Sequence, residues 1–125
     1  MARVLALVPD LLFGSQVQGS LTAAGHELEL IGDAPRLRER LSAPGQARAQ
    51  VLVVDLTDAQ LDGVAVYESL LAGDLLGAVK TLAFYSHVDA DTGARARAAG
   101  FDLVVARSRM AREGAELVAR LADAT

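Results

Sequence analysis

Short apolar runs alternate along this chain with segments that have helical periodicity. Four of the runs stop at a proline or a polar residue, as strands buried on both faces of a parallel sheet do; they are Arg3 to Val8, Gln50 to Asp55, Thr81 to Tyr85 and Leu103 to Ala106. His26 to Ile31 instead alternates polar and apolar positions, which is typical of an edge strand with one wetter face. The Gln50–Asp55 run is the richest in β-branched residues, which predicts a central strand.

Five segments carry apolar residues at helical spacing, one after each predicted strand. They are Leu12 to Ala24, Pro35 to Leu41, Val66 to Leu71, Asp89 to Ala99 and Met110 to Leu121. Gly25 and Gly100 suit the ends of two of these helices, and Ala43-Pro44-Gly45 is expected to end the second. Strict alternation of strands and helices predicts an α/β fold whose parallel sheet is covered on both faces.

Composition narrows the class of protein. The chain has 125 residues, of which 52% are hydrophobic, and 12 basic against 16 acidic side chains give a net charge of -4. This is enough for one core, so we expect a single domain over residues 1–125 with no output domain. Net negative charge disfavours nucleic acid, and no apolar run approaches the length of a membrane span. Cysteine is absent, which leaves a metal only oxygen ligands or His26 and His87.

Polar residues follow the predicted strands at their carboxyl ends. Ligands of doubly wound folds bind there, at the point where the strand order reverses. For the flavodoxin-like order 2-1-3-4-5 that point lies between the first and third strands. The side chains at strand ends are Asp10, Asp55, Ser86 and Arg107. Two carboxylates, a hydroxyl and a permanent cation suit Mg²⁺ and a phosphoryl group.

With these residues in place, the chain resembles the receiver domain of bacterial two-component response regulators over essentially all its length. Asp55-Leu-Thr-Asp-Ala-Gln-Leu-Asp-Gly63 is similar to the family's segment in which a phosphoacceptor Asp precedes the Gly of an apolar-Asp-Gly triplet by eight residues. Ala99-Gly100 and Asp102-Leu-Val-Val-Ala-Arg107 place the family's basic position, normally lysine, at Arg107. The resemblance implies a flavodoxin-like (βα)5 fold with helices on both faces of a five-stranded parallel sheet.

The resemblance also implies a role for each site residue. Asp55 would accept a phosphoryl group, Ser86 would be the switch hydroxyl, and Arg107 would take the place of lysine. Asp10, Asp55 and the Thr57 carbonyl would bind Mg²⁺. We therefore expect a stand-alone atypical receiver in the cytoplasm. It would act through contacts with proteins, such as a histidine kinase, and homodimers remain open.

Several positions depart from the family's pattern. Pro9-Asp10 supplies one acid where two adjacent acids are usual, which predicts weakened Mg²⁺ binding. Arginine is longer and more planar than lysine, so Arg107 could instead clamp Asp55 directly. Ser108 replaces the proline that usually follows the lysine, which removes the usual reason for a cis peptide there. Val104 replaces the switch aromatic, and Tyr85 and His87, which flank Ser86, are the candidates to substitute for it.

Two other functions remain open at this point. One is a pseudo-receiver that binds a partner without phosphorylation. The other, ranked lower, is a Rossmann-like domain for a nucleotide or small ligand, suggested by Ala24 to Ile31 followed by Asp33. It needs a glycine-rich turn after the first strand, and Pro9 to Gly14 contains one glycine.

Overall fold

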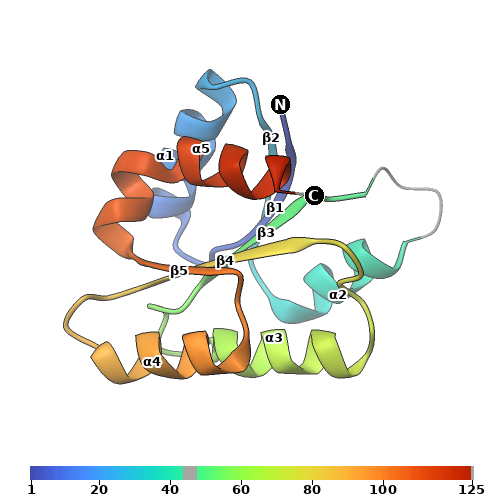
Figure 1. Cartoon of the computed structure of the whole chain (residues 1–125), viewed down its shortest axis with the longest axis vertical. Helices are drawn as coiled ribbons and strands as arrows, with labels where there is room; N and C mark the ends of the chain where they lie inside the picture. The colour runs from blue at the N-terminus through green and yellow to red at the C-terminus, as the bar shows by residue number, and fades with distance from the viewer. Residues whose placement is uncertain (44–47, 125) are drawn as a thin grey trace.

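Five parallel strands lie between two layers of helices (Figure 1) in a computed structural model that describes residues 1–43 and 48–124. The strands are β1 (Arg3–Leu7), β2 (Glu27–Ile31), β3 (Val51–Asp55), β4 (Lys80–Tyr85) and β5 (Leu103–Ala106). The helices are α1 (Leu11–Ala23), α2 (Ala34–Ser42), α3 (Gly63–Ala72), α4 (Ala90–Ala99) and α5 (Arg107–Asp123). The sheet order β2-β1-β3-β4-β5 confirms the predicted order, with β3 at the centre.

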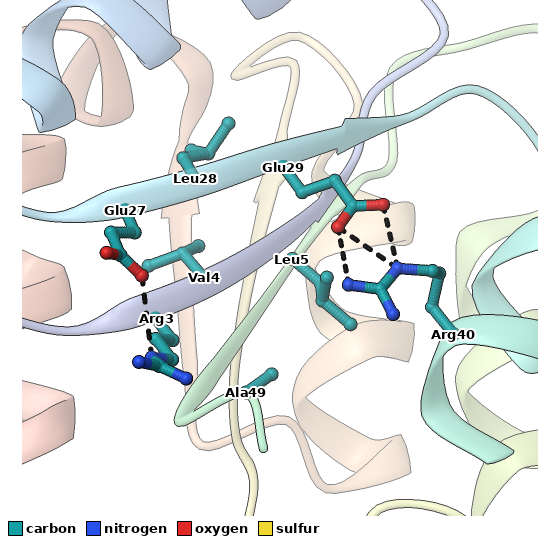
Figure 2. A pocket seen from close by; sticks show the side chains of 8 residues that line it. All are labelled: Arg3, Val4, Leu5, Glu27, Leu28, Glu29, Arg40 and Ala49. Carbon is teal, nitrogen blue, oxygen red and sulfur yellow. Dashed lines mark hydrogen bonds and ion pairs between the residues drawn. The ribbon is translucent and has the colours of Figure 1, made fainter. Parts of the chain in front are cut away.

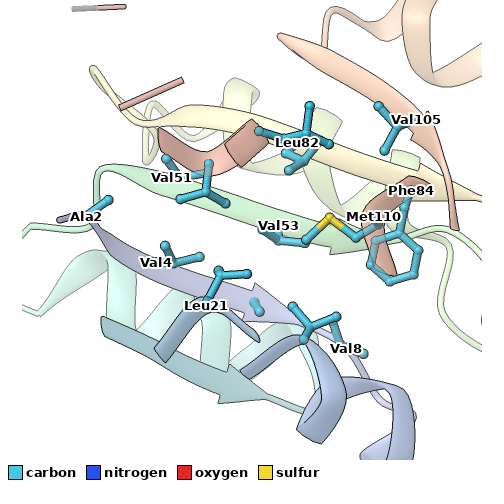
Figure 3. Packing of buried hydrophobic residues seen from close by; sticks show 14 of the residues in the cluster. Ala2, Val4, Val8, Leu21, Val51, Val53, Leu82, Phe84, Val105 and Met110 are labelled. Carbon is cyan, nitrogen blue, oxygen red and sulfur yellow. The ribbon is translucent and has the colours of Figure 1, made fainter. Parts of the chain in front are cut away.

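The hydrophobic core consists of two clusters, one on each face of the sheet. Successive side chains of a strand point to opposite faces. Val51 and Val53 of β3 therefore pack toward α1 and α5, where Figure 3 shows them with Met110, whereas Leu52 and Val54 pack toward α2, α3 and α4. These four residues of β3 are fully buried. Burial on both faces explains why β3 reads as a continuous apolar run.

Aspartates begin four of the five helices. Asp10, Asp33, Asp62 and Asp89 precede α1, α2, α3 and α4, and each side chain accepts a hydrogen bond from a backbone N–H of the first turn. Such caps satisfy N–H groups that have no partner within the helix and typically stabilise it by about 1 kcal/mol. Several acids of the sequence, Asp10 among them, therefore have a structural role.

The start of α5 differs from the sequence-based prediction, and the surroundings of Gly63 explain why a glycine is found there. Helix α5 begins at Arg107, three residues before the predicted start, directly after β5 and without a side-chain cap. Arg107-Ser-Arg109 contains no helix breaker, and an Arg109–Glu113 ion pair of 3.5 Å supports the first turn. Gly63 is needed where it stands, because a Cβ atom there would lie 2.6 Å from Leu56. Of the expected helix end at Ala43-Pro44-Gly45, Pro44 and Gly45 lie outside the described residues.

The edge of the sheet at β2 is bordered by ion pairs. Arg40 of α2 forms a two-pronged pair with Glu29, and Arg3 pairs with Glu27, beside a hollow of about 240 Å³ near the amino ends of β1 and β2 (Figure 2). The Arg40 guanidinium lowers the pKa of Glu29. The Arg3–Glu27 pair is mostly exposed and the Arg40–Glu29 pair is partly exposed, so solvent screens both and each contributes little to stability. This hollow contains none of the residues predicted to form the site.

His26 is a buried structural residue. Its Nδ1 accepts a hydrogen bond from the Ala2 N–H at 3.0 Å, and its Nε2 lies 3.2 Å from the Ala115 carbonyl oxygen, to which it donates. Both ring nitrogens are therefore occupied by the chain itself, which leaves neither for a metal ion. Among the described residues, no helix is long and apolar enough to span a membrane.

Candidate functional site

An open cavity of about 700 Å³ lies at the carboxyl ends of the strands. It is lined by Asp10, Phe13, Asp55, Thr57, Asp58, Ala59, Ser86, His87, Arg107, Ser108 and Ala111. The parallel sheet brings these residues together, because it places the carboxyl ends of all its strands along one edge. All five predicted site residues, namely Asp10, Asp55, Thr57, Ser86 and Arg107, line this one cavity.

Asp55 is the last residue of β3, and only 1% of its surface is exposed. Its Oδ1 atom accepts hydrogen bonds from the Thr57 backbone N–H at 2.7 Å and the Thr57 hydroxyl at 2.6 Å. Burial raises the pKa of Asp55; the Thr57 hydrogen bonds and the charge of Arg107 partly oppose this, whereas Asp58 adds to it. The sequence had suggested only the carbonyl of Thr57, although an Asp followed two residues later by Thr is a known pattern of local side-chain bonding.

The second oxygen of Asp55 has no hydrogen-bond partner among the described residues. None of the hydrogen bonds found among the described residues uses Oδ2. In the described part of the chain, every fully buried side-chain nitrogen or oxygen has a hydrogen-bond partner. Oδ2 has no such partner and is therefore not fully buried. Because Asp55 lines the cavity, this oxygen is the one that a ligand could reach.

Asp10 has both carboxylate oxygens engaged. Oδ1 accepts from the backbone N–H groups of Leu12 at 3.0 Å and Phe13 at 3.1 Å, as the cap of α1. Oδ2 accepts from Nη2 of Arg107 at 3.3 Å, in an ion pair whose two side chains are 43% and 45% exposed. The resemblance implied that Asp10 would bind a metal ion, and in the structure it caps a helix and binds arginine.

Arg107 lies against α1. Its guanidinium carbon is 4.2 Å from the centre of the Phe13 ring, a cation–π contact, while its Nη2 donates to Asp10. The suggestion that Arg107 clamps Asp55 directly is wrong, because its partner is Asp10. The reason is the early start of α5, which places Arg107 in the first helical turn beside Phe13. Its positive charge still lowers the pKa of Asp55 against the effect of burial.

Ser86 and its two neighbours separate in the structure. Ser86 and His87 line the cavity, whereas the Tyr85 ring packs against α4. A Cβ atom on Gly93 would lie 2.8 Å from that ring, and the Arg97 guanidinium carbon is 5.4 Å from its centre. Of the two candidates to replace the switch aromatic, only His87 is therefore at the cavity, and Tyr85 fixes α4 to the sheet.

The residues as arranged do not fit a bound metal ion. The described residues include no group of three or more carboxylate or imidazole side chains placed to hold one. Asp10 already accepts three hydrogen bonds, one of them from a permanent cation. Mg²⁺ needs near-octahedral oxygen ligands, and Asp10 can offer it a free oxygen only after Arg107 moves away. Among the residues that line the cavity, the one permanent positive charge is that of Arg107.

Comparison with solved structures assigns the fold. The chain superposes on FixJ-N with a TM-score of 0.82 at 21% identity, over 100% of this chain and 96% of that one. It superposes on a CheY-like response regulator receiver domain protein from Methanospirillum hungatei with a TM-score of 0.80 at 16% identity, covering 98% and 94%. The Mn²⁺-bound form of response regulator Rcp1 gives 0.74 at 17%, covering 94% and 89%.

These neighbours show that the chain has the flavodoxin-like fold of response regulator receiver domains, which confirms the fold predicted from the sequence. No protein-family model matches the sequence, and no curated protein matches it either. At such identities the likeness concerns the fold, and the function has to be argued from the site.

Proposed function

We propose that this chain is a receiver-like signalling domain of the cytoplasm that acts through contacts with other proteins, and that its site works without a divalent cation. The observation that carries the proposal is the Asp10–Arg107 ion pair. A fixed guanidinium provides positive charge where a metal ion would otherwise provide it, and the same guanidinium occupies the carboxylate that would bind the metal. The site therefore needs no Mg²⁺ to balance Asp10.

The geometry of Asp55 agrees with a role that does not depend on phosphorylation. No ion pair of the described residues includes this carboxyl. Phosphoryl transfer to a carboxylate needs strong neutralisation of charge on the transferring group. One guanidinium, already paired with Asp10, offers less of this than a metal ion together with a free lysine.

Phosphorylation of Asp55 is the second candidate function. It is favoured by the Oδ2 atom of Asp55, which accepts no hydrogen bond from the described residues, and by Ser86, which lines the same cavity. In that case Oδ2 would attack the phosphorus of a small phosphodonor, the donor's leaving group would depart with its electron pair, and an acyl phosphate would remain on Asp55.

Titration with Mg²⁺ tests the proposal, with amide NMR spectra as the measurement. We expect the wild-type spectrum to be unchanged at millimolar Mg²⁺, also with beryllofluoride. Arg107→Ala frees Asp10 and should allow saturable Mg²⁺ shifts at Asp55 and Thr57, which Asp55→Asn in the same protein should abolish. Arg112→Ala is the matched control, because Arg112 is 70% exposed. Among the described residues it forms one ion pair, a long one of 3.9 Å to Glu113, and a long hydrogen bond of 3.4 Å to the Ser108 carbonyl.

Two results would overturn the proposal. One is saturable Mg²⁺ binding by the wild-type protein at Asp10 and Asp55. The other is a mass increase of one phosphoryl group after incubation with acetyl phosphate and Mg²⁺, lost in Asp55→Asn, which would establish the second candidate instead.

A further inference from the structure

Three exposed apolar side chains are next in sequence to residues that line the cavity. Leu11, Leu12 and Val88 are 77%, 73% and 80% exposed. Leu11 and Leu12 follow the lining residue Asp10 and precede Phe13, and Val88 follows the lining residue His87. Among the described residues, the other exposed large apolar side chains are Met1 at the amino terminus and Leu71, which is 47% exposed. Exposed apolar residues that lie near one another mark interaction sites more often than single ones do.

The cavity at the carboxyl ends of the strands carries unbalanced negative charge. Its acids are Asp10, Asp55 and Asp58, and its one permanent cation is Arg107, which is paired with Asp10. No ion pair of the described residues includes Asp55 or Asp58. Asp58 has one oxygen bound to the backbone N–H groups of Gln60 and Leu61. Two carboxylates thus lack a cationic partner, and Asp55 is almost completely buried.

We propose that this face docks a segment of a partner protein in which a lysine or arginine side chain is flanked by apolar ones. The cation would enter the cavity toward Asp55 Oδ2 and Asp58, and the apolar side chains would cover Leu11, Leu12 and Val88. The inference rests on the proposed function and names the chemistry of the partner. A basic side chain supplies the counter-charge that the cavity lacks in the absence of a metal.

Charge complementarity decides between occupants. An acidic or phosphorylated segment would place like charge beside Asp55 and Asp58, which is unfavourable in a partly desolvated site. A cation paired there is screened less than one on an open surface. Covering the three apolar side chains adds hydrophobic stabilisation, at about 25 cal/mol for each Å² removed from water. The combination of a charged anchor with apolar neighbours is the usual anatomy of a small interface centre.

Selection from a random peptide library on the immobilised full chain tests the docking surface. We expect the enriched peptides to carry a lysine or arginine between apolar residues. A synthetic representative should bind the wild-type chain and lose roughly tenfold or more in affinity, equivalent to about 1.4 kcal/mol, in Asp55→Asn/Asp58→Asn. The loss should be similar in Leu11→Ser/Leu12→Ser/Val88→Ser. Asparagine can keep the local hydrogen bonds at both aspartates, and the other three side chains are exposed, so these variants should fold.

Leu71→Ser is the matched control, because Leu71 is 47% exposed on α3 and does not line the cavity; it should bind the peptide like wild type. Peptides without a basic residue, affinity unchanged in the variants, or no enrichment at all would each overturn the inference. A dimer in light scattering that the leucine and valine substitutions dissociate would assign the face to a second copy instead. Mg²⁺ binding by the wild type would overturn the proposed function without altering the peptide result, so the two failures are distinguishable.

Discussion

Two Asp–Thr pairs occupy opposite ends of the sheet and use the same local chemistry. At the carboxyl end, one oxygen of Asp55 accepts from both the N–H and the hydroxyl of Thr57. At the amino end, one oxygen of Asp102 accepts from the N–H and the hydroxyl of Thr81, at 2.8 and 3.1 Å. The Thr81 hydroxyl also accepts from the Asp102 N–H at 3.0 Å, which closes the pair and joins the starts of β4 and β5.

The pairs differ in the surroundings of the second carboxylate oxygen. Asp102 is exposed, so water solvates its charge, whereas Asp55 is buried with its free oxygen in a cavity. An exposed carboxylate that is solvated by water and bound to the donors of a neighbouring threonine has a structural role. A buried acid with one oxygen left over is available for a ligand. The difference shows that hydrogen bonds to a neighbouring threonine alone do not separate a carboxylate that is solvated at the surface from one that lines a cavity.

The largest expected effect belongs to the amino end. Asp102→Ala removes the acceptor for two donors of Thr81, a residue that is only 2% exposed. Leaving buried donors unsatisfied should lower the free energy of unfolding by about 2 kcal/mol, measured by urea denaturation. Asp102→Asn is the control and should change it little, because one carbonyl oxygen suffices for both donors. If the two variants were equally destabilised, the charge of Asp102 would matter and the comparison with Asp55 would fail.

The fold could be predicted because the spacing of apolar residues along the sequence agrees with the positions that are buried in the strands and helices. The apolar run at Val51 to Val54 becomes the fully buried central strand, and the alternating run of β2 becomes an edge strand. The start of α5 could not be predicted, because Arg107-Ser-Arg109 contains no residue that excludes either loop or helix. Boundaries of this kind depend on how the helix docks, which is not a local property of the sequence.

The members of the site could be predicted, but not their pairing. Strand ends converge in a parallel sheet, so placing Asp10, Asp55 and Arg107 at strand ends was sufficient to bring them together. The partner of Arg107 depends on the first turn of α5 and on the Phe13 ring, which are far apart in sequence. The cap that Asp10 forms is local, because its side chain accepts from the N–H groups of Leu12 and Phe13, two and three residues along the chain.

Substitution of Asp10 tests whether an acid at the carboxyl end of the sheet has a structural role, as Asp102 has at the amino end. Asp10→Ala removes the cap of α1 and should lower the free energy of unfolding by about 1 kcal/mol. Asp10→Asn retains a side-chain oxygen for the cap and loses only the half-exposed ion pair with Arg107, so a few tenths of a kcal/mol are expected. Urea denaturation of both variants measures the difference. An equal cost in the two would mean that the ion pair, and not the cap, makes Asp10 structural.

An effect of opposite sign is expected for Asp55→Asn. Asparagine can accept both Thr57 hydrogen bonds and avoids the burial of a charge, so the variant should be more stable than wild type at neutral pH, by up to about 1 kcal/mol.

The gain should depend on pH. Because burial raises the pKa of Asp55 in the folded state, the folded protein binds more protons than the unfolded chain between the two pKa values. Wild-type stability from this group is therefore lost as pH rises from the unfolded value of about 3.9 through the raised folded value. The advantage of Asp55→Asn should vanish at acid pH, grow across that window and then level off. Denaturation of both proteins over this pH range isolates it, since Asp62 and Glu29, whose pKa values are lowered, affect both proteins alike. A gain that does not vary with pH would mean that Asp55 carries no unbalanced charge, and that it resembles Asp102 after all.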